Sequence, residues 1–212
     1  MSQASPVFER HYDDYLRQLA GLDLNLIGPA LGGEMVDGTW VKIPYFNRTY
    51  RVSSKGIAGP DGRKPGYDTC TILCRYLIMA GETPAGAGDG SPDTGDWVGF
   101  RDLKESGPLT VYFRDNVELA VSGILSGRTG EAGAISAGLN GAPPDMDVNY
   151  DLALEIRALP AIPMLLLFND AEEGFPASCS VLFRADVERF LDAECIAMIG
   201  YRLAAVIKKI LP

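Results

Sequence analysis

The segment whose residue types could most readily do chemistry lies in the C-terminal third of the chain, at residues 169–176. It brings together Asp170, Glu172 and Glu173, with Phe175 beside them, directly after an apolar run typical of a buried strand. Crowded carboxylates can raise one another's pKa, bind a divalent cation or bind a cationic group. Loops on a rigid scaffold commonly carry function. These four residues are therefore candidates for a ligand-binding site, and a solvated turn is the alternative interpretation.

Three aromatic residues point to a second way of holding a ligand. Trp97 and Phe100 follow a long irregular segment, and Tyr76 lies on a predicted helix. An apolar pocket with a few polar groups is the usual form of a small-molecule site. We therefore count Trp97, Phe100 and Tyr76 among the candidate ligand-binding residues. If they instead pack in a solid core with no pocket, this hypothesis loses its support.

Several well-known catalytic motifs are missing from the sequence. There is no phosphate-loop pattern and no nucleophile elbow, and the glycines at 86–90 lack the flanking strand and helix of a dinucleotide site. His11 is the only histidine, so a zinc centre with two or three imidazoles is excluded. It lies on the apolar side of the first predicted helix, which favours a structural role. The catalytic residues stay unassigned.

The four cysteines give no support for a metal centre. They stand at positions 70, 74, 179 and 195, without the tight Cys-x-x-Cys pairs of zinc and iron–sulfur sites. Cys70 and Cys74 are one helical turn apart and read as small core residues, with half of a metal site as the alternative. We predict no metal, zinc or iron–sulfur site, and the cofactor is unknown.

Charge and hydropathy limit the partners and the location. The chain has 19 basic and 28 acidic residues among 212, a net charge of −9, which is the wrong balance for binding phosphates of nucleic acid. The N-terminus lacks the pattern of a secretory signal. The longest apolar run, Ile162–Phe168, is far shorter than the roughly 20 residues that span a bilayer. We expect a cytoplasmic protein that binds neither nucleic acid nor membrane.

Hydrophobic periodicity and turn residues predict the elements of the N-terminal half. A helix begins at Pro6 and ends at Gly21, and a hairpin covers residues 39–53. Residues 56–66 are expected to form a loop. A second helix runs from Asp68 to Gly81. The following stretch, 81–96, is rich in Gly, Pro and Asp, and we expect a mobile surface loop there.

The C-terminal half predicts helices, then a sheet, then a final helix. The helices cover about 114–126 and 129–139. Residues 148–158 alternate between apolar and polar side chains, which indicates a strand with one buried face. The continuous apolar run 162–168 indicates a strand covered on both faces and paired antiparallel with the first. The expected fold class is α+β, with an antiparallel sheet packed against several helices and a long C-terminal helix. We expect residues 1–212 to form a single domain.

The chain resembles, over most of its length and most specifically in its last third, an uncharacterised domain-of-unknown-function family of anaerobic bacteria and archaea. The segments that carry the resemblance are Leu159–Asp170, Phe175–Ser178, Val181–Phe183 and Phe190–Glu194. Some members of that family are joined to a four-cysteine iron–sulfur domain like that of corrinoid iron–sulfur proteins. This chain lacks those cysteines, so the resemblance implies that any link to redox or one-carbon metabolism comes through a partner. Gly174 stands where relatives tend to carry an acid before Phe-Pro.

Three functions are compatible with the sequence. The leading hypothesis is a ligand-binding or accessory module in anaerobic cofactor or redox metabolism, with a small-molecule or redox-protein partner. The second is an enzyme that uses Asp170, Glu172 and Glu173 in acid/base or metal-assisted chemistry. The third is a structural protein that forms a homodimer or a larger homo-oligomer.

Overall fold

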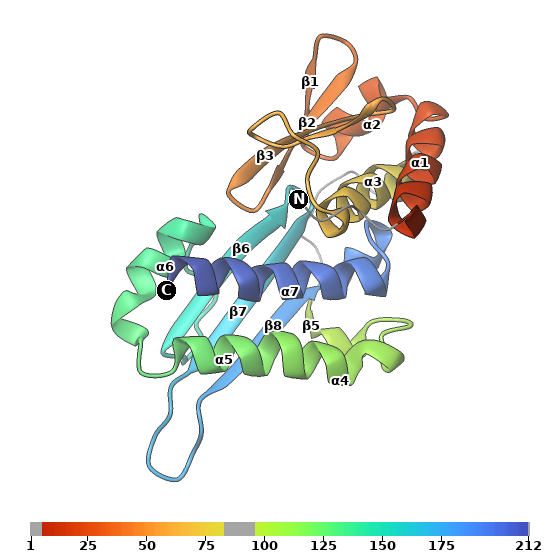
Figure 1. Ribbon diagram of the computed structural model, residues 1–212. Coiled ribbons are helices and arrows are strands. Elements are labelled where there is room, and N and C mark those ends of the chain that lie inside the picture. The colour runs from red at the N-terminus through yellow and green to blue at the C-terminus, as the bar shows by residue number, and fades with distance from the viewer. Residues whose placement is uncertain (1–5, 83–95, 212) are drawn as a thin grey trace. The chain divides into compact units, whose positions relative to one another are not determined.

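The computed structural model describes residues 6–82 and 96–211, which form two compact units (Figure 1). The N-terminal unit contains residues 6–82 and two short returning segments, Leu159–Ala161 and Arg189–Leu191. The remaining described residues form the C-terminal unit. The single domain expected over residues 1–212 stays a prediction. The expected loop at 81–96 falls almost wholly outside the described residues.

The described part of the N-terminal unit combines a four-stranded antiparallel sheet with helices. The strands follow the order β1-β2-β3-β4. They are β1 (Glu34–Val36), β2 (Trp40–Tyr45), β3 (Arg48–Ser53) and β4 (Gly56–Ala58). The helices are α1 (Pro6–Ala20), α2 (Leu24–Ala30) and α3 (Tyr67–Glu82).

The alternation of side chains along β2 and β3 explains why this sheet has one covered face. Val41 pairs with Val52 and Ile43 pairs with Tyr50, and all four side chains are buried. The pairing of β2 with β3 confirms the hairpin predicted at 39–53. It forms because strand-favouring residues alternate along both strands and a two-residue turn joins them. The loop predicted over 56–66 was wrong for its first three residues, which form β4 at the edge of the sheet.

The C-terminal unit has a second four-stranded antiparallel sheet, in the order β5-β8-β7-β6, within the residues described. Its strands are β5 (Trp97–Gly99), β6 (Leu152–Leu159), β7 (Ile162–Asn169) and β8 (Ser178–Arg184). The α-helices are α4 (Thr110–Phe113), α5 (Leu119–Leu125), α6 (Ala132–Leu139) and α7 (Ala193–Ile210). A π-helical stretch, Arg114–Glu118, joins α4 to α5 without a break, and short 3-10 turns cover Phe100–Asp102, Gly107–Leu109, Thr129–Glu131 and Val187–Arg189.

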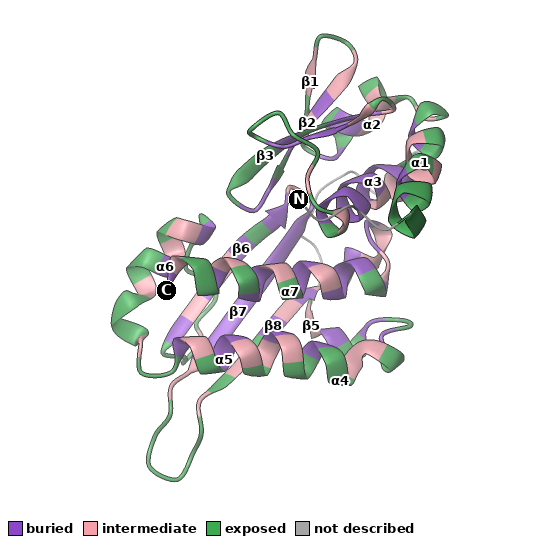
Figure 2. Cartoon of the chain, in the orientation of Figure 1, coloured by how far each residue is buried: buried purple, intermediate pink, exposed green. Residues whose placement is uncertain are grey.

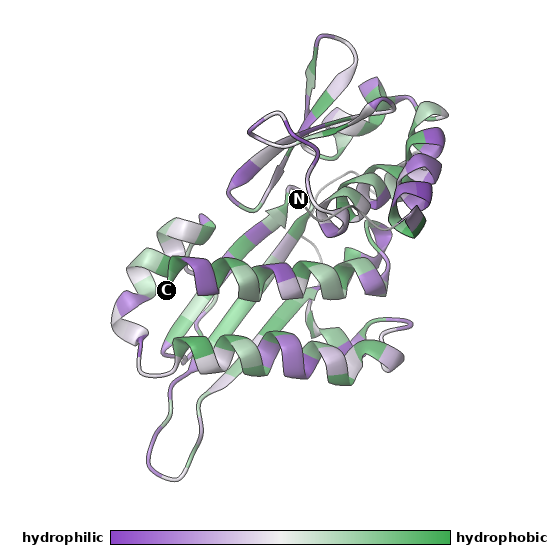
Figure 3. Cartoon of the chain, in the orientation of Figure 1, coloured by the Kyte–Doolittle hydropathy of each residue, from purple (hydrophilic) through white to green (hydrophobic). Residues whose placement is uncertain are grey.

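The core of this unit lies along β7. Every residue from Ile162 to Phe168 is buried, whereas β6 alternates between buried and more exposed positions (Figure 2). Helices α5 and α7 lie across one face of the sheet (Figure 1), and the strands beneath them are mostly apolar (Figure 3). The strand predicted at 162–168 and the α+β fold class are confirmed. The strand predicted at 148–158 was wrong for its first four residues, because β6 begins at Leu152 and Tyr150 is exposed. The two-residue link between β6 and β7 forces the antiparallel pairing that the sequence predicted.

The predicted C-terminal helix is also confirmed, and the structure shows its N-terminal cap. The Asp192 side chain accepts a hydrogen bond from the Cys195 backbone N–H at 2.9 Å, which satisfies one of the free donors at the start of α7. Lys208 and Lys209 lie in its last turn, where positive charge complements the helix dipole. Among the described residues, no helix is long and apolar enough to cross a membrane.

An aromatic cluster fixes the place where α7 passes α4. The Phe113 ring stacks on Phe100 with centroids 4.3 Å apart and meets Phe183 edge-on at 6.0 Å. Gly200 of α7 lies against the same ring, because a Cβ added there would come within 2.5 Å of Phe113. Glycine is therefore required at position 200 for the helix to approach this closely.

Candidate functional site

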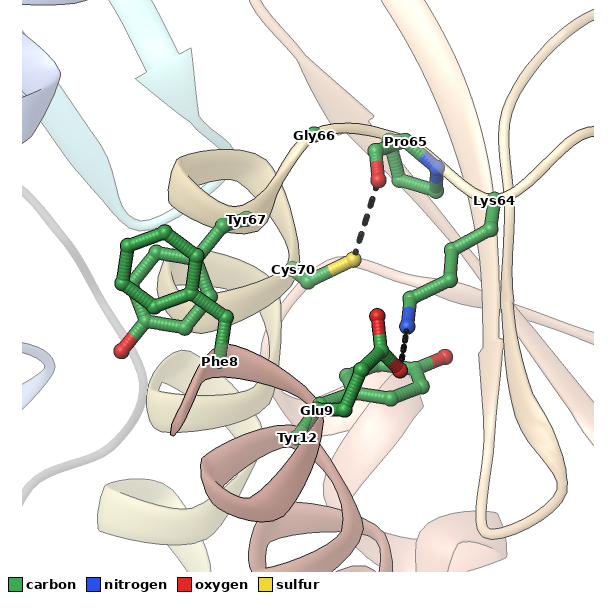
Figure 4. Close-up of a pocket in the computed structure, with 8 residues that line it drawn as sticks. All are labelled: Phe8, Glu9, Tyr12, Lys64, Pro65, Gly66, Tyr67 and Cys70. Carbon is green, nitrogen blue, oxygen red and sulfur yellow. Dashed lines mark hydrogen bonds and ion pairs between the residues drawn. The ribbon is translucent and has the colours of Figure 1, made fainter. Parts of the chain in front are cut away.

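The N-terminal unit contains a pocket of about 330 Å³ between α1 and the start of α3 (Figure 4). Its volume is near the lower end of the range typical of small-molecule sites. The pocket is lined by Phe8, Glu9 and Tyr12 of α1, by the loop residues Lys64, Pro65 and Gly66, and by Tyr67 and Cys70 of α3. The lining combines aromatic rings, one cation, one carboxylate and one thiol.

A cation and a carboxylate face each other in this pocket. The Lys64 ammonium lies 2.7 Å from a carboxylate oxygen of Glu9 and 3.8 Å from the centre of the Tyr12 ring. The Tyr12 hydroxyl accepts a hydrogen bond from the Ile57 backbone N–H at 2.9 Å, which ties α1 to strand β4. The ring of Tyr12 is thus fixed. The Lys64 ammonium is held by two contacts, the cation–π contact with this ring and the ion pair with Glu9.

Cys70 forms a buried part of the pocket wall. Its Sγ donates a weak hydrogen bond to the Pro65 carbonyl oxygen at 3.6 Å (Figure 4). Burial raises the pKa of the Cys70 thiol to about 12, with the nearby Lys64 ammonium opposing the shift. A thiol with so high a pKa stays protonated at neutral pH and is a poor nucleophile. Cys70 therefore contributes packing and polarisability to the pocket wall and no nucleophile.

An aromatic stack closes another side of the pocket. The rings of Phe8 and Tyr67 lie 4.2 Å apart and nearly parallel, at 19°. The Tyr67 hydroxyl lies 3.2 Å from Nδ1 of His11, one turn of α1 further along. His11 thus orients Tyr67 by a hydrogen bond. The placement expected for this histidine, on the apolar side of the helix, was wrong, because the structure leaves His11 exposed.

The acidic segment predicted as a site begins with an anchored carboxylate. Asp170 accepts hydrogen bonds from the Gly127 backbone N–H at 2.9 Å and from the Ser126 hydroxyl at 3.3 Å. The Gly127 bond lowers the pKa of Asp170 most, followed by a 2.8 Å bond from the Ala171 N–H, and the Ser126 bond contributes less. Its own backbone N–H donates to Asp151 at 2.7 Å. This carboxylate therefore holds the end of β7 to the loop that follows α5.

Glu172, Glu173 and Phe175 belong to a tight turn beyond Asp170. Glu172 and Phe175 exchange two backbone hydrogen bonds, of 3.0 and 2.9 Å, and Gly174 between them has a φ of +84°. Type II turns require this conformation at their third position, and glycine adopts it without strain. The Phe175 side chain is 74% exposed. The structure thus places the three residues close together on a solvated turn between β7 and β8.

The three aromatic candidates lie in different surroundings. Tyr76 is fully buried in the N-terminal unit, where its hydroxyl donates to the Leu31 carbonyl at 3.1 Å and accepts from the Ala161 N–H at 3.0 Å. In the C-terminal unit, the Arg184 guanidinium lies 3.9 Å from the centre of the Trp97 ring. Phe100 is buried in the cluster around Phe113. Tyr76 and Phe100 are therefore packed in the core of their respective units.

A carboxylate that sequence reasoning missed lies at the end of the π-helical stretch. Glu118 accepts a hydrogen bond at 3.2 Å from the backbone N–H of Val181 in β8, opposite the edge that pairs with β7. One turn further on, the Ser122 hydroxyl donates to the Ala177 carbonyl at 3.2 Å. These two side chains satisfy backbone groups along a strand edge, a common protection against edge-to-edge pairing. Burial raises the pKa of Glu118, opposed by the Val181 bond and by Arg101 and Arg114.

We expect the replacement of Glu118 by leucine to destabilise the protein by about 1–3 kcal/mol, because the Val181 N–H loses its acceptor. Glu118→Gln keeps an acceptor and should cost less.

The raised pKa of Glu118 also predicts a pH dependence. The folded protein keeps the carboxyl proton at pH values where the unfolded chain has lost it. The free energy of unfolding of the wild type therefore falls as pH rises between the unfolded and the folded pKa of Glu118. In denaturant unfolding between about pH 4 and pH 7, the free energy of unfolding of Glu118→Gln should therefore rise relative to that of the wild type as pH rises. A constant difference would contradict this.

The pocket residues were not predicted as a set, and the reason is their separation along the chain. Glu9 and Lys64 are 55 positions apart, and no periodic pattern connects them. Cys70 was singled out as a small core residue, with half of a metal site as the alternative. The one available signal was the run Lys64-Pro65-Gly66-Tyr67 at the start of α3, where a cation and an aromatic side chain follow a glycine- and proline-rich segment.

Comparison with protein families gives one match. The model described as "Domain of unknown function (DUF3786)" matches residues 23–206. The match includes the loop and α3 side of the pocket but not Phe8, Glu9 and Tyr12 of α1. No curated protein and no solved structure matches this chain.

Proposed function

The chain belongs to the DUF3786 family, and from that starting point we propose that it is a small-molecule-binding accessory module. The observation that carries the proposal is the pocket between α1 and α3, with its charged pair, aromatic walls and buried thiol. Concave sites with a few convergent polar groups are the usual form of small-molecule sites. The protonated Cys70 and the fixed Tyr12 favour binding over catalysis.

The pathway that the module serves is inferred from the resemblance of its last third to proteins of anaerobic bacteria and archaea. We propose a cytoplasmic role in anaerobic cofactor or redox metabolism, in which a redox-protein partner supplies the iron–sulfur centre. Membrane and nucleic acid have no part in this role, and a homodimer is compatible with it. The pocket volume of about 330 Å³ is too small for a corrinoid macrocycle, so the ligand is a smaller molecule.

Fragment screening by amide NMR tests the proposal. We expect hits from a library of small aromatic and polar compounds to shift the amide signals of Lys64, Tyr67 and Cys70. Cys70→Phe, which fills the pocket, should weaken these hits by at least about tenfold, equivalent to ~1.4 kcal/mol. Tyr67→Ala, which removes a wall without filling the space, should weaken them too.

The matched control is Cys74→Ala. Cys74 is buried one turn along α3 but is not among the lining residues, so this variant should keep the wild-type affinities. Mass spectrometry of protein purified without oxygen then identifies the natural ligand. The proposal is wrong if no compound shifts the three amides, or if Cys70→Phe folds normally and binds the hits as tightly as wild type.

A further inference from the structure

We infer that the pocket takes a zwitterion, a small molecule that carries an ammonium and a carboxylate group like an amino acid. This inference rests on the proposed function and names the ligand class of the same site. It comes from the ion pair between Glu9 and Lys64, which lie on different elements and contribute one negative and one positive charge to the lining.

The geometry leaves both charges within reach of a ligand. The Lys64 side chain is 41% exposed and the Glu9 side chain 48%, although their charged atoms are only 2.7 Å apart. One oxygen of Glu9 bonds the ammonium, and Figure 4 shows the second on the side of Cys70, outside the drawn ion pair. Exposed pairs of this kind contribute little to stability, typically about 0–1 kcal/mol, so a ligand can open the pair at small cost.

Charge balance then selects between ligand types. A ligand with a single negative charge would bind Lys64 and leave Glu9 without its partner, and an amine would do the reverse. A zwitterion replaces one ion pair by two, because its carboxylate meets Lys64 while its ammonium meets Glu9. Hydrogen bonds between charged groups are stronger than neutral ones, so the exchange favours binding.

The remaining walls define the body of the ligand. The stacked rings of Phe8 and Tyr67 offer an apolar surface beside the charged pair. Tyr12 keeps Lys64 from swinging away, since its ring holds the ammonium at 3.8 Å. A volume of about 330 Å³ accommodates one amino acid with an aromatic or branched side chain. The ligand class is therefore a single amino acid or a close analogue.

Calorimetry with three related probes tests this inference. L-Phenylalanine carries both charges, phenethylamine only the ammonium, and hydrocinnamate only the carboxylate. We expect L-phenylalanine to bind at least about tenfold more tightly than either analogue. Lys64→Met should remove its advantage over phenethylamine, and Glu9→Gln should remove its advantage over hydrocinnamate. The double variant Glu9→Lys with Lys64→Glu exchanges the two charges and should keep the preference for the zwitterion.

The results separate this inference from the proposed function. If the two analogues bind as tightly as L-phenylalanine, or if none of the three binds while other fragments still shift the Lys64, Tyr67 and Cys70 amides, the zwitterion inference is overturned and the binding module stands. If no compound of any class shifts those amides, both are overturned.

Discussion

Truncating Phe113 to alanine should lower the free energy of unfolding by about 3–5 kcal/mol, the usual cost of removing a buried aromatic ring. The ring is almost completely buried and touches three parts of the C-terminal unit. It stacks on Phe100, meets Phe183 edge-on, and lies against Gly200 of α7. These neighbours belong to a 3-10 turn, a central strand and a long helix, so they cannot all move in to fill the cavity.

Denaturant unfolding followed by tryptophan fluorescence measures this loss. The chain has two tryptophans, Trp40 in the N-terminal unit and Trp97 in the C-terminal unit, so a Trp40→Phe background makes Trp97 the sole reporter. The matched control is Tyr112→Ala, the neighbouring aromatic residue, whose side chain is 46% exposed. It should change stability by no more than about 0.5 kcal/mol. Equal losses in the two variants would show that the cluster does not hold this unit together.

The second large effect is expected from removing a single oxygen. Tyr76→Phe should cost about 2–4 kcal/mol, because the hydroxyl serves two buried backbone groups at once and each unsatisfied group costs roughly 1–3 kcal/mol. It donates to the Leu31 carbonyl, after α2, and accepts from the Ala161 N–H, in the link between β6 and β7. Burial also raises the pKa of Tyr76, so the hydroxyl keeps the proton it donates.

Trp40 fluorescence in a Trp97→Phe background reports this change, since Trp40 lies in the same unit as Tyr76. Tyr201→Phe is a suitable control, because that side chain is 53% exposed on α7. Hydrogen exchange provides a second readout, in which the Ala161 amide should lose protection in Tyr76→Phe. Wild-type stability in this variant, with unchanged Ala161 protection, would refute the assigned role.

The parts of the fold that could be predicted are those with a strong local pattern. The apolar run of β7 and the alternation in β6 both act within a few residues, so the sequence alone revealed them. Helix α2 was missed because it has only seven residues, including Gly28 and Pro29, which normally count against a helix. Strand β4 was missed because it has three residues and begins with glycine.

The candidate sites were harder to predict than the helices and strands, because their contacts join residues that lie far apart in the sequence. The acidic segment was placed correctly at the end of a buried strand, but the partners of Asp170 are Ser126 and Gly127, more than 40 positions away. Glu118 gave no signal at all, since its role depends on the edge of β8 beside it. The pocket combines α1 with the loop before α3. A site formed by residues so far apart in the sequence depends on the tertiary fold, so the spacing of residues along the chain could not predict it.

The chain leaves its first folding unit and returns to it twice, at Leu159–Ala161 and Arg189–Leu191. Domains generally fold from the N-terminus as the ribosome makes them. The core formed by residues 6–82 is therefore completed only after two segments that are synthesised much later have emerged. Until Ala161 emerges, the Tyr76 hydroxyl lacks one of its two partners. A gene fragment that encodes only the first unit will therefore yield an incomplete core, and separate expression of the pocket requires those two returning segments to be supplied in trans or fused by a linker.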